Sequence, residues 1–209
     1  MEPIKNLIKL GELNCSNNQI KSLGPIESLI DLEVLVCTYN QVQSLEPIKN
    51  LINLKKLYCL YNQIQSLEPI ENLINLELLA CSNNQIQSLE PNLINLKALF
   101  CSYNKIISLE PIKNLIKLRE LFCSDNKIQS LEPIENLINL EVLVCTNNQI
   151  RSLEPIRILI KLRKLFCSDN KIQSLEPIYD LTNLRYLAYS NNPVEYIPPD
   201  IVKNSLDKK

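Results

Sequence analysis

The 209-residue sequence contains no histidine and no tryptophan, and its only glycines are Gly11 and Gly24. Histidine is the commonest general base, so the usual nucleophile–base pairs cannot be assembled from this chain. Two isolated glycines also cannot form a glycine-rich phosphate loop, and no metal-binding motif is present. We therefore expect a protein that is not an enzyme and that needs no cofactor and no metal.

The chain also lacks an excess of charge of either sign. The chain carries 22 Lys and Arg against 23 Asp and Glu, a net charge of −1, so nothing attracts it to nucleic acid or to an anionic membrane. It has no apolar run of 18 residues, and its first six residues, MEPIKN, lack the apolar core of a signal peptide. We expect no nucleic acid and no membrane among its partners, and a cytoplasmic location.

The chain consists instead of one repeated unit. Residues 118–139 read LRELFCSDNKIQSLEPIENLIN, and we number this unit as positions 1 to 22. The asparagine at position 9 recurs every 22 residues, except for one interval of 20: Asn18, Asn40, Asn62, Asn84, Asn104, Asn126, Asn148, Asn170 and Asn192. A fixed period of this size over nine coils predicts a solenoid.

The spacing within the unit predicts how each coil is built. Positions 4 and 6 share one face of a strand, so Leu121 and Cys123 should point inward. Asn126 should end the strand and satisfy backbone groups from coil to coil. Pro133 favours a short helical or 3₁₀ turn on the return leg, and the apolar residues at positions 17, 20 and 21 are expected to form one inward stripe.

The pattern L-x-x-L-x-C-x-x-N-x-I followed by x-S-L-E-P-I-x-N-L-I resembles the leucine-rich repeat, in the 22-residue class of the internalins and a regulatory subunit of type 1 protein phosphatase. The resemblance implies a curved α/β solenoid, with short parallel strands on the concave face and short helical or 3₁₀ turns on the convex side. It also implies that the concave face binds another protein. Cysteine at position 6 departs from the family, which usually has leucine there.

The composition, rich in Asn, Ile and Lys, resembles that of leucine-rich repeat proteins of giant amoebal viruses of the mimivirus type. A viral origin would make the expected location the host cytoplasm.

The repeat predicts a single domain over residues 1–209: a half coil at 1–9, coils to about 197, and a cap and tail at 198–209. The first coil exposes apolar positions and lacks a polar cap, so we expect a missing preceding cap or domain, or a second chain over that end. Residues 89–93 lack two residues of the return leg, so the strand ladder should continue there while the convex side tightens.

The eight cysteines allow three interpretations: disulfides, a metal site or buried thiols. Neighbouring in-register strands hold their Cα–Cβ bonds nearly parallel, which does not suit a disulfide torsion. A straight ladder also brings two thiols near one point, but not the four that a metal site needs. We favour a ladder of buried, reduced thiols, which fits a cytosolic compartment. The cysteines are Cys15, Cys37, Cys59, Cys81, Cys101, Cys123, Cys145 and Cys167.

Charges at positions 18 and 2 mostly alternate in sign from coil to coil. Stacked opposite charges on exposed coils are worth at most about 1 kcal/mol each, but they favour the correct register. Position 18 carries Lys5, Glu27, Lys49, Glu71, Lys113, Glu135 and Arg157, and position 2 carries Glu33, Lys55, Glu77, Lys97, Arg119, Glu141 and Arg163.

Function is expected where the repeat varies, on the outward strand positions 3 and 5 and on position 8. These positions form an apolar and aromatic band on the concave face, and such a band is typical of protein interfaces. The candidate partner-binding residues are Val36, Tyr39, Tyr58, Tyr61, Phe100, Tyr103, Phe122, Val144, Lys164, Phe166 and Tyr186. The alternative is that these rings only pack on one another as cross-strand ladders.

Two functions follow from these residues. The first is a non-catalytic protein-interaction module, an adaptor or regulator that binds another protein on its concave face. The second is a self-associating structural protein, a homodimer formed through the concave face or through the uncapped end.

Overall fold

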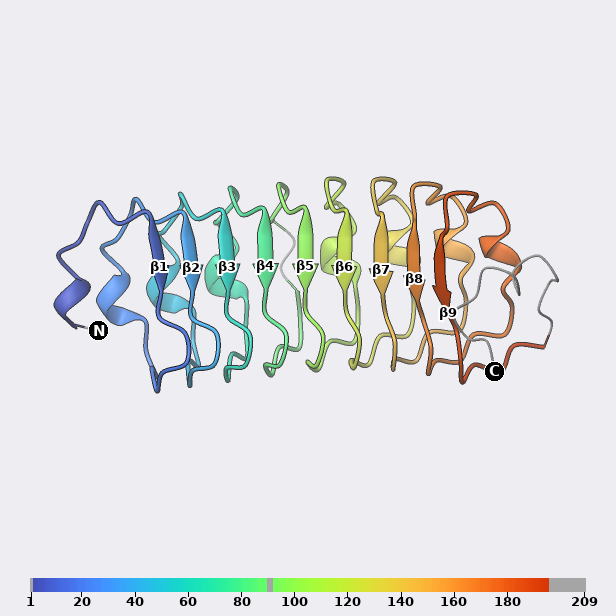
Figure 1. The fold of residues 1–209 in the computed structure, drawn as a ribbon, viewed down its shortest axis with the longest axis horizontal. Helices are drawn as coiled ribbons and strands as arrows, with labels where there is room; N and C mark the ends of the chain where they lie inside the picture. The colour runs from blue at the N-terminus through green and yellow to red at the C-terminus, as the bar shows by residue number, and fades with distance from the viewer. Residues whose placement is uncertain (1, 90–91, 196–209) are drawn as a thin grey trace.

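The computed structural model describes residues 2–89 and 92–195. The cap and tail expected at 198–209 therefore lie outside the described residues. Nine three-residue strands form one parallel sheet in the order of the sequence, and Figure 1 shows them side by side with the helical turns behind them. The strands are β1 (Glu12–Asn14), β2 (Val34–Val36), β3 (Lys56–Tyr58), β4 (Leu78–Ala80), β5 (Ala98–Phe100), β6 (Glu120–Phe122), β7 (Val142–Val144), β8 (Lys164–Phe166) and β9 (Tyr186–Ala188).

Short 3₁₀ turns form the opposite side of the solenoid. They begin at a Glu-Pro or Gly-Pro pair, because proline fixes φ for the first turn and has no N–H to leave unpaired. The serine two residues before every turn except the first accepts a hydrogen bond from the turn's first N–H, as Ser130 Oγ does from Glu132 N at 3.1 Å. The turns are η1 (Glu2–Ile4), η2 (Gly24–Ile26), η3 (Glu46–Ile48), η4 (Glu68–Ile70), η5 (Glu110–Ile112), η6 (Glu132–Ile134), η7 (Glu154–Ile156) and η8 (Glu176–Ile178).

The strand ladder continues through the short coil, as the sequence predicts. β4 pairs with β5 in the same register as every other neighbour, with Leu79 opposite Leu99. The two residues that this coil lacks relative to the others belong to its return leg, and Glu90 and Pro91 there lie outside the described residues.

The core is a column of leucine, isoleucine and cysteine that runs through the array. Leu121 and Cys123 are fully buried, and so are their equivalents from the second coil to the eighth. Leu13 and Cys15 in the first coil are only partly buried. The inward direction of positions 4 and 6 is thus confirmed.

The asparagine ladder is also confirmed, and its bonds show what it does. Asn148 Nδ2 donates to the carbonyl oxygens of Cys145 at 3.1 Å and of Cys123, one coil earlier, at 3.0 Å. Its Oδ1 accepts a bond from Ile128 N at 2.9 Å. Each such asparagine therefore closes its own turn and joins it to the preceding coil.

Position 21 contradicts the sequence expectation. The isoleucines there were expected in the inward stripe, but they are between 49% and 56% exposed: Ile8, Ile30, Ile52, Ile74, Ile94, Ile116, Ile138 and Ile160. Position 20 is the adjacent residue and is a buried leucine in every coil from Leu29 to Leu181. Two successive residues of a loop cannot both point into the core, and leucine at position 20 takes that place.

A second asparagine row holds these loops together. At position 22 the amide of Asn53 donates to the carbonyl oxygen of Ile30 at 3.0 Å, and the amide of Asn139 donates to that of Ile116 at 2.8 Å. The isoleucine loops are therefore fixed in register by side-chain bonds as well as by the core.

Candidate partner-binding face

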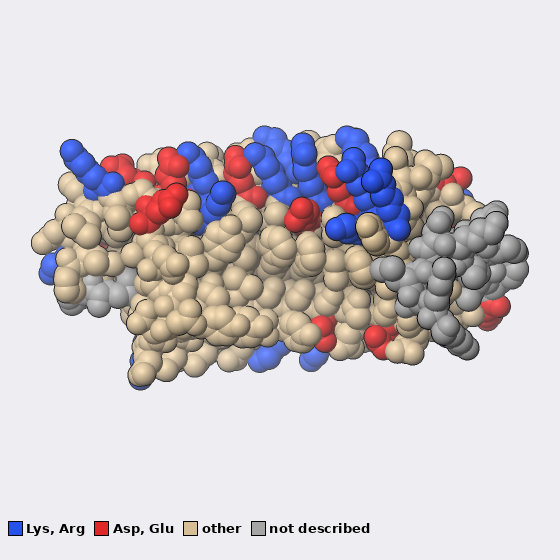
Figure 2. Space-filling view, in the orientation of Figure 1, with Lys and Arg blue, Asp and Glu red and all other residues tan. Residues whose placement is uncertain are grey.

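The outward side of the sheet is largely uncharged. Figure 2 shows tan side chains over the strands, with Lys, Arg, Asp and Glu gathered along the upper edge, where the strands begin. We call the surface formed by positions 3, 5 and 8 the sheet face. Most of the charge in this view lies along the upper edge, and fewer charged side chains lie along the lower edge.

The position-5 side chains on this face are half-buried, except for exposed Asn14 and buried Ala80. Phe100 and Phe122 stack with ring centroids 4.7 Å apart and planes at 25°. Val144 lies between Phe122 and Phe166 in the strand pairing. These side chains pack on their cross-strand neighbours and still present part of their surface to solvent.

The position-8 tyrosines are more exposed and less expected. Tyr39, Tyr61 and Tyr103 are 50%, 43% and 57% exposed, and their φ angles are +55°, +52° and +55°. Position 8 has a positive φ in all nine coils, and the other six coils carry Asn or Asp there. Asn and Asp tolerate this conformation, whereas a bulky residue is a backbone outlier.

These tyrosines interact mainly with one another and with a neighbouring acid. The rings of Tyr39 and Tyr61 stack 4.2 Å apart at 10°, and a hydrogen bond with Tyr61 raises the pKa of the Tyr39 hydroxyl. The charge of Asp125 and a hydrogen bond to it raise the pKa of Tyr103. Position 8 is therefore aromatic in three of the coils from the second to the fifth, and polar beyond them.

The far end of the sheet face has a different character. Lys164 Nζ lies 5.4 Å from the ring centroid of Tyr186, in a cation–π arrangement. Beside them, at position 8, Asn191 Nδ2 donates to Asp169 Oδ1 at 2.8 Å. The predicted residues thus lie in a row along the whole face and do not converge on one pocket.

The cysteines form a ladder behind this face. Cys37, Cys59, Cys81, Cys101, Cys123, Cys145 and Cys167 are buried, Cys15 is half-buried, and all eight are free thiols. Burial raises the pKa of Cys37, Cys81 and Cys145 to about 12. Such thiols are not nucleophiles at neutral pH, so the ladder belongs to the core, as the sequence predicts.

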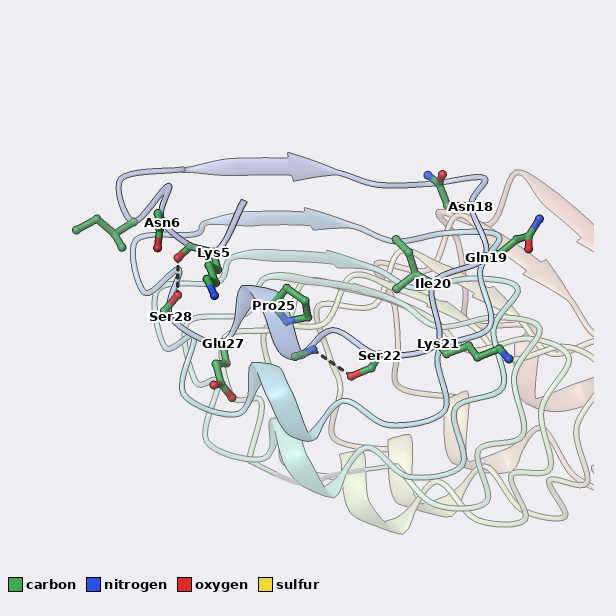
Figure 3. Close-up of a pocket in the computed structure, with 12 residues that line it drawn as sticks. Lys5, Asn6, Asn18, Gln19, Ile20, Lys21, Ser22, Pro25, Glu27 and Ser28 are labelled. Carbon is green, nitrogen blue, oxygen red and sulfur yellow. Dashed lines mark hydrogen bonds between the residues drawn. The ribbon is translucent and has the colours of Figure 1, made fainter. Parts of the chain in front are cut away.

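An open hollow of about 1080 Å³ lies on the exposed side of the first coil (Figure 3). Lys5 and Glu27 lie toward one end of it and Asn18 and Lys21 toward the other, with apolar residues between them. Its charged groups do not converge on a common point, so we assign it no chemistry.

Other kinds of site are not found in the part of the chain that the structure describes. Residues 2–89 and 92–195 contain no group of three or more side chains that could hold a metal ion. In the same residues, no helix has the length and apolar character needed to cross a bilayer.

Known proteins and structures support the fold. The family "Leucine Rich repeats (2 copies)" matches residues 8–50, 52–94, 116–157 and 160–203. No curated protein matches the chain. An internalin, InlF of Listeria monocytogenes, is 31% identical with a TM-score of 0.95, and the alignment covers 100% of this chain and 64% of that one. This sequence therefore spans less than two thirds of that internalin's length.

Two further structures are similar. A leucine-rich repeat protein of Leptospira interrogans is 28% identical with a TM-score of 0.86, over 98% of this chain and 55% of that one. The functional domain of InlJ from Listeria monocytogenes, which includes a cysteine ladder, is 28% identical with a TM-score of 0.75, over 95% of this chain and 48% of that one. The repeat, the parallel sheet and the matched residues lead to one conclusion: the chain belongs to the leucine-rich repeat family.

Proposed function

We propose that this chain is a protein-interaction module, an adaptor or regulator, that binds another protein on its concave sheet face. The observation that carries the proposal is the placement of Tyr39, Tyr61 and Tyr103 at a positive φ with their rings exposed. A bulky residue in this conformation costs on the order of 1 kcal/mol, and an exposed ring does not recover that cost through burial. Rigid, exposed aromatic side chains are common anchors of protein interfaces.

The half-buried side chains at position 5 extend the proposed contact surface. Val36 and Tyr58 lie on the strands beside the stacked tyrosines, and Phe100 and Phe122 lie beside Tyr103. A partner that covered the tyrosines would also reach these side chains. The surface it would meet is mainly apolar, and its charged members at position 3, such as Lys56 and Glu120, lie where the strands begin.

The experiment compares the partners captured from an extract of the source cells by two variants, each of which replaces exposed tyrosine with asparagine. A triple variant, Tyr39→Asn, Tyr61→Asn and Tyr103→Asn, uses the residue that other coils carry at this position and should lose the partner. Tyr179→Asn changes a tyrosine that is 46% exposed just after η8, and should retain it. Equal capture by both variants would contradict the proposal.

Self-association through the concave face remains the second candidate, because stacked exposed rings could equally meet a second copy. Light scattering over a range of concentrations tests it. A dimer that the triple tyrosine variant dissociates would favour self-association over an adaptor role.

The proposed location is the cytoplasm, that of the host if the gene is viral. Eight free thiols in one ladder suit a reducing compartment. The test is a thiol count on protein prepared from the native cell. Free thiols would agree with a cytoplasmic location, and blocked or disulfide-paired thiols would argue against it.

A further inference from the structure

The most extensive exposed apolar feature outside the sheet face is the isoleucine row at position 21. Eight isoleucines, each about half exposed, follow one another along the edge where the strands begin. We call this surface, from position 18 to position 2 of each coil, the strand-start edge. Single exposed apolar residues need no explanation, but a continuous row of this length does.

Nothing in the coil itself explains isoleucine at this position. The core is closed by leucine at position 20, and the loop is held by backbone bonds such as Ile52 N to Asn50 O at 2.9 Å. The last coil has an exposed threonine, Thr182, at position 21 and keeps the same loop, with Asn183 donating to Ile160 O at 2.8 Å. A polar residue therefore serves the fold equally well.

Charged side chains flank the isoleucine on both sides in six of the eight loops. Position 18 directly follows the 3₁₀ turn, as Lys49 follows η3, and position 2 directly precedes the strand residues. Within one loop the two flanking charges have the same sign. The flanking pairs are Glu27 and Glu33 at Ile30, Lys49 and Lys55 at Ile52, Glu71 and Glu77 at Ile74, Lys113 and Arg119 at Ile116, Glu135 and Glu141 at Ile138, and Arg157 and Arg163 at Ile160.

The short coil reverses the phase of this alternation. Before it the loops at Ile30, Ile52 and Ile74 read acidic, basic, acidic, and after it the loops at Ile116, Ile138 and Ile160 read basic, acidic, basic. The central loop at Ile94 has lost position 18 with the deletion and keeps only Lys97. The charge pattern is thus inverted in sign about Ile94.

A pattern inverted in sign about its centre is complementary to itself after a two-fold rotation. We propose that two copies of this chain pair through their strand-start edges, antiparallel, with the two-fold axis passing through Ile94. The loop at Ile30 then faces that of Ile160 in the second copy, Ile52 faces Ile138, and Ile74 faces Ile116. In these six loops every flanking charge faces one of opposite sign, and at position 22 Asp31 also faces Lys161.

Other registers fail on the same criterion. A shift of one coil puts the acidic loop at Ile30 opposite the acidic loop at Ile138, and the basic loop at Ile52 opposite the basic loop at Ile116. In a parallel dimer each loop faces the equivalent loop of the second copy, so the flanking charges that meet have the same sign. The single unfavourable pair of the proposed register is Lys97 against Lys97, at the axis itself.

The area and the shape also suit a second copy. Eight isoleucines that are each about half exposed offer roughly 800 Å², which is what one partner contributes to an interface of standard size. The antiparallel rotation places the sheet side of one copy over the sheet side of the other, and the turn side over the turn side. The two arrays therefore curve in the same direction. The dimer leaves both concave faces open on one side, free for the proposed partner.

Mass in solution is the first test, by analytical ultracentrifugation over a wide concentration range. Wild type should form a dimer, and Ile94→Lys, which adds two more ammonium groups beside the Lys97 pair at the axis, should be monomeric. The matched control is Ile107→Lys, because Ile107 is 61% exposed but lies at position 12, away from the edge. A wild-type monomer throughout, or a dimer that survives Ile94→Lys, would overturn the proposal.

The register has its own test by charge exchange. Glu71→Lys should weaken the dimer by about tenfold, because two attractive pairs become repulsive. Adding Lys113→Glu in the same chain should restore the wild-type affinity, since Glu71 and Lys113 face each other across the axis. Addition of Lys49→Glu in place of Lys113→Glu should give no recovery, and recovery with it would overturn this register.

Cross-linking distinguishes the direction of pairing. In a Cys15→Ser background, which removes the half-buried native thiol, Ile94→Cys should link to itself with a short bismaleimide. Ile30→Cys and Ile160→Cys should each fail alone and link to each other when mixed. Self-linking of Ile30→Cys would indicate a parallel dimer and contradict the proposal.

Discussion

At the scale of single residues, position 8 shows where the sequence departs from what its backbone favours. All nine coils turn there with φ between +52° and +57°. Six coils carry the Asn or Asp that this turn favours, and three carry tyrosine. Tyrosine at these three positions lowers the stability of the fold, and we attribute its presence there to the proposed interface.

The position-8 cost predicts a substitution that stabilises the fold. Tyr103→Asn should raise the free energy of unfolding by about 1 kcal/mol, because asparagine adopts the left-handed conformation more readily. Urea denaturation followed by circular dichroism measures the change. Asn83→Ala, at the same position of the preceding coil, should lower stability by a similar amount, and an increase would refute the account.

The buried thiols predict a pH dependence. Cysteine titrates near 9.0 when unfolded, whereas Cys37, Cys81 and Cys145 titrate at about 12 in the fold. Above pH 9 the unfolded chain therefore binds fewer protons than the folded one, and stability falls as pH rises. The contribution of these thiols to stability is fully present below about pH 9 and is lost progressively toward pH 12.

These three thiols together should lower the free energy of unfolding by about 4 kcal/mol per pH unit between pH 9 and 11. Urea midpoints at several pH values give the slope. Cys145→Ala should make it shallower by about 1.4 kcal/mol per unit, whatever it does to stability at neutral pH. An unchanged slope would mean that the thiols do not control alkaline unfolding.

At the scale of the element, the coil is closed by its asparagine. Asn148 is 8% exposed, and it bonds Cys145 O, Cys123 O and Thr146 O with its amide and Ile128 N with its oxygen. Removal of this side chain takes a donor from the three carbonyl oxygens and an acceptor from Ile128 N, and burial makes an unpaired group costly.

Asn148→Ala should therefore destabilise the protein by about 3 kcal/mol. The control is Asn139→Ala at position 22, whose amide bonds Ile116 O at 2.8 Å from a more exposed loop, and it should cost less than about 1 kcal/mol. Both values come from urea unfolding. Equal losses would show that the two asparagine rows contribute alike.

At the scale of the whole molecule, each coil is stabilised by its two neighbours. Among residues 2–89 and 92–195, each strand pairs only with the preceding and the following strand. Stability is then close to a sum over coils and their contacts, so the same change has different effects at the centre and at the end of the array.

Leu121→Ala in the sixth coil should cost about 3 kcal/mol, because its side chain is fully buried between two coils. Leu13→Ala is the same change in the first coil, where the leucine is only partly buried, and should cost about 1 kcal/mol. Hydrogen exchange should show that the first variant opens the central coils and the second opens only the end. Similar costs would contradict nearest-neighbour behaviour.

The sequence alone determined the period, the number of coils, the strand register, the inward leucines and cysteines, the asparagine ladder and the Glu-Pro-Ile turns. Each depends on spacing or on local backbone chemistry, both of which are visible in one unit and repeated in the others. The concave row from Val36 to Tyr186 could also be named, because position 5 alternates with buried positions along a strand.

Only the tertiary structure decided what the loops expose. Positions 20 and 21 are both apolar, and a linear pattern does not tell which of two adjacent residues turns inward, so the Ile138 row was wrongly placed in the core. The positive φ beneath Tyr39, Tyr61 and Tyr103 was equally hidden, since it comes from the turn that stacking imposes on every coil. Both features depend on the path of the backbone between neighbouring coils, and that path exists only when the coils are stacked.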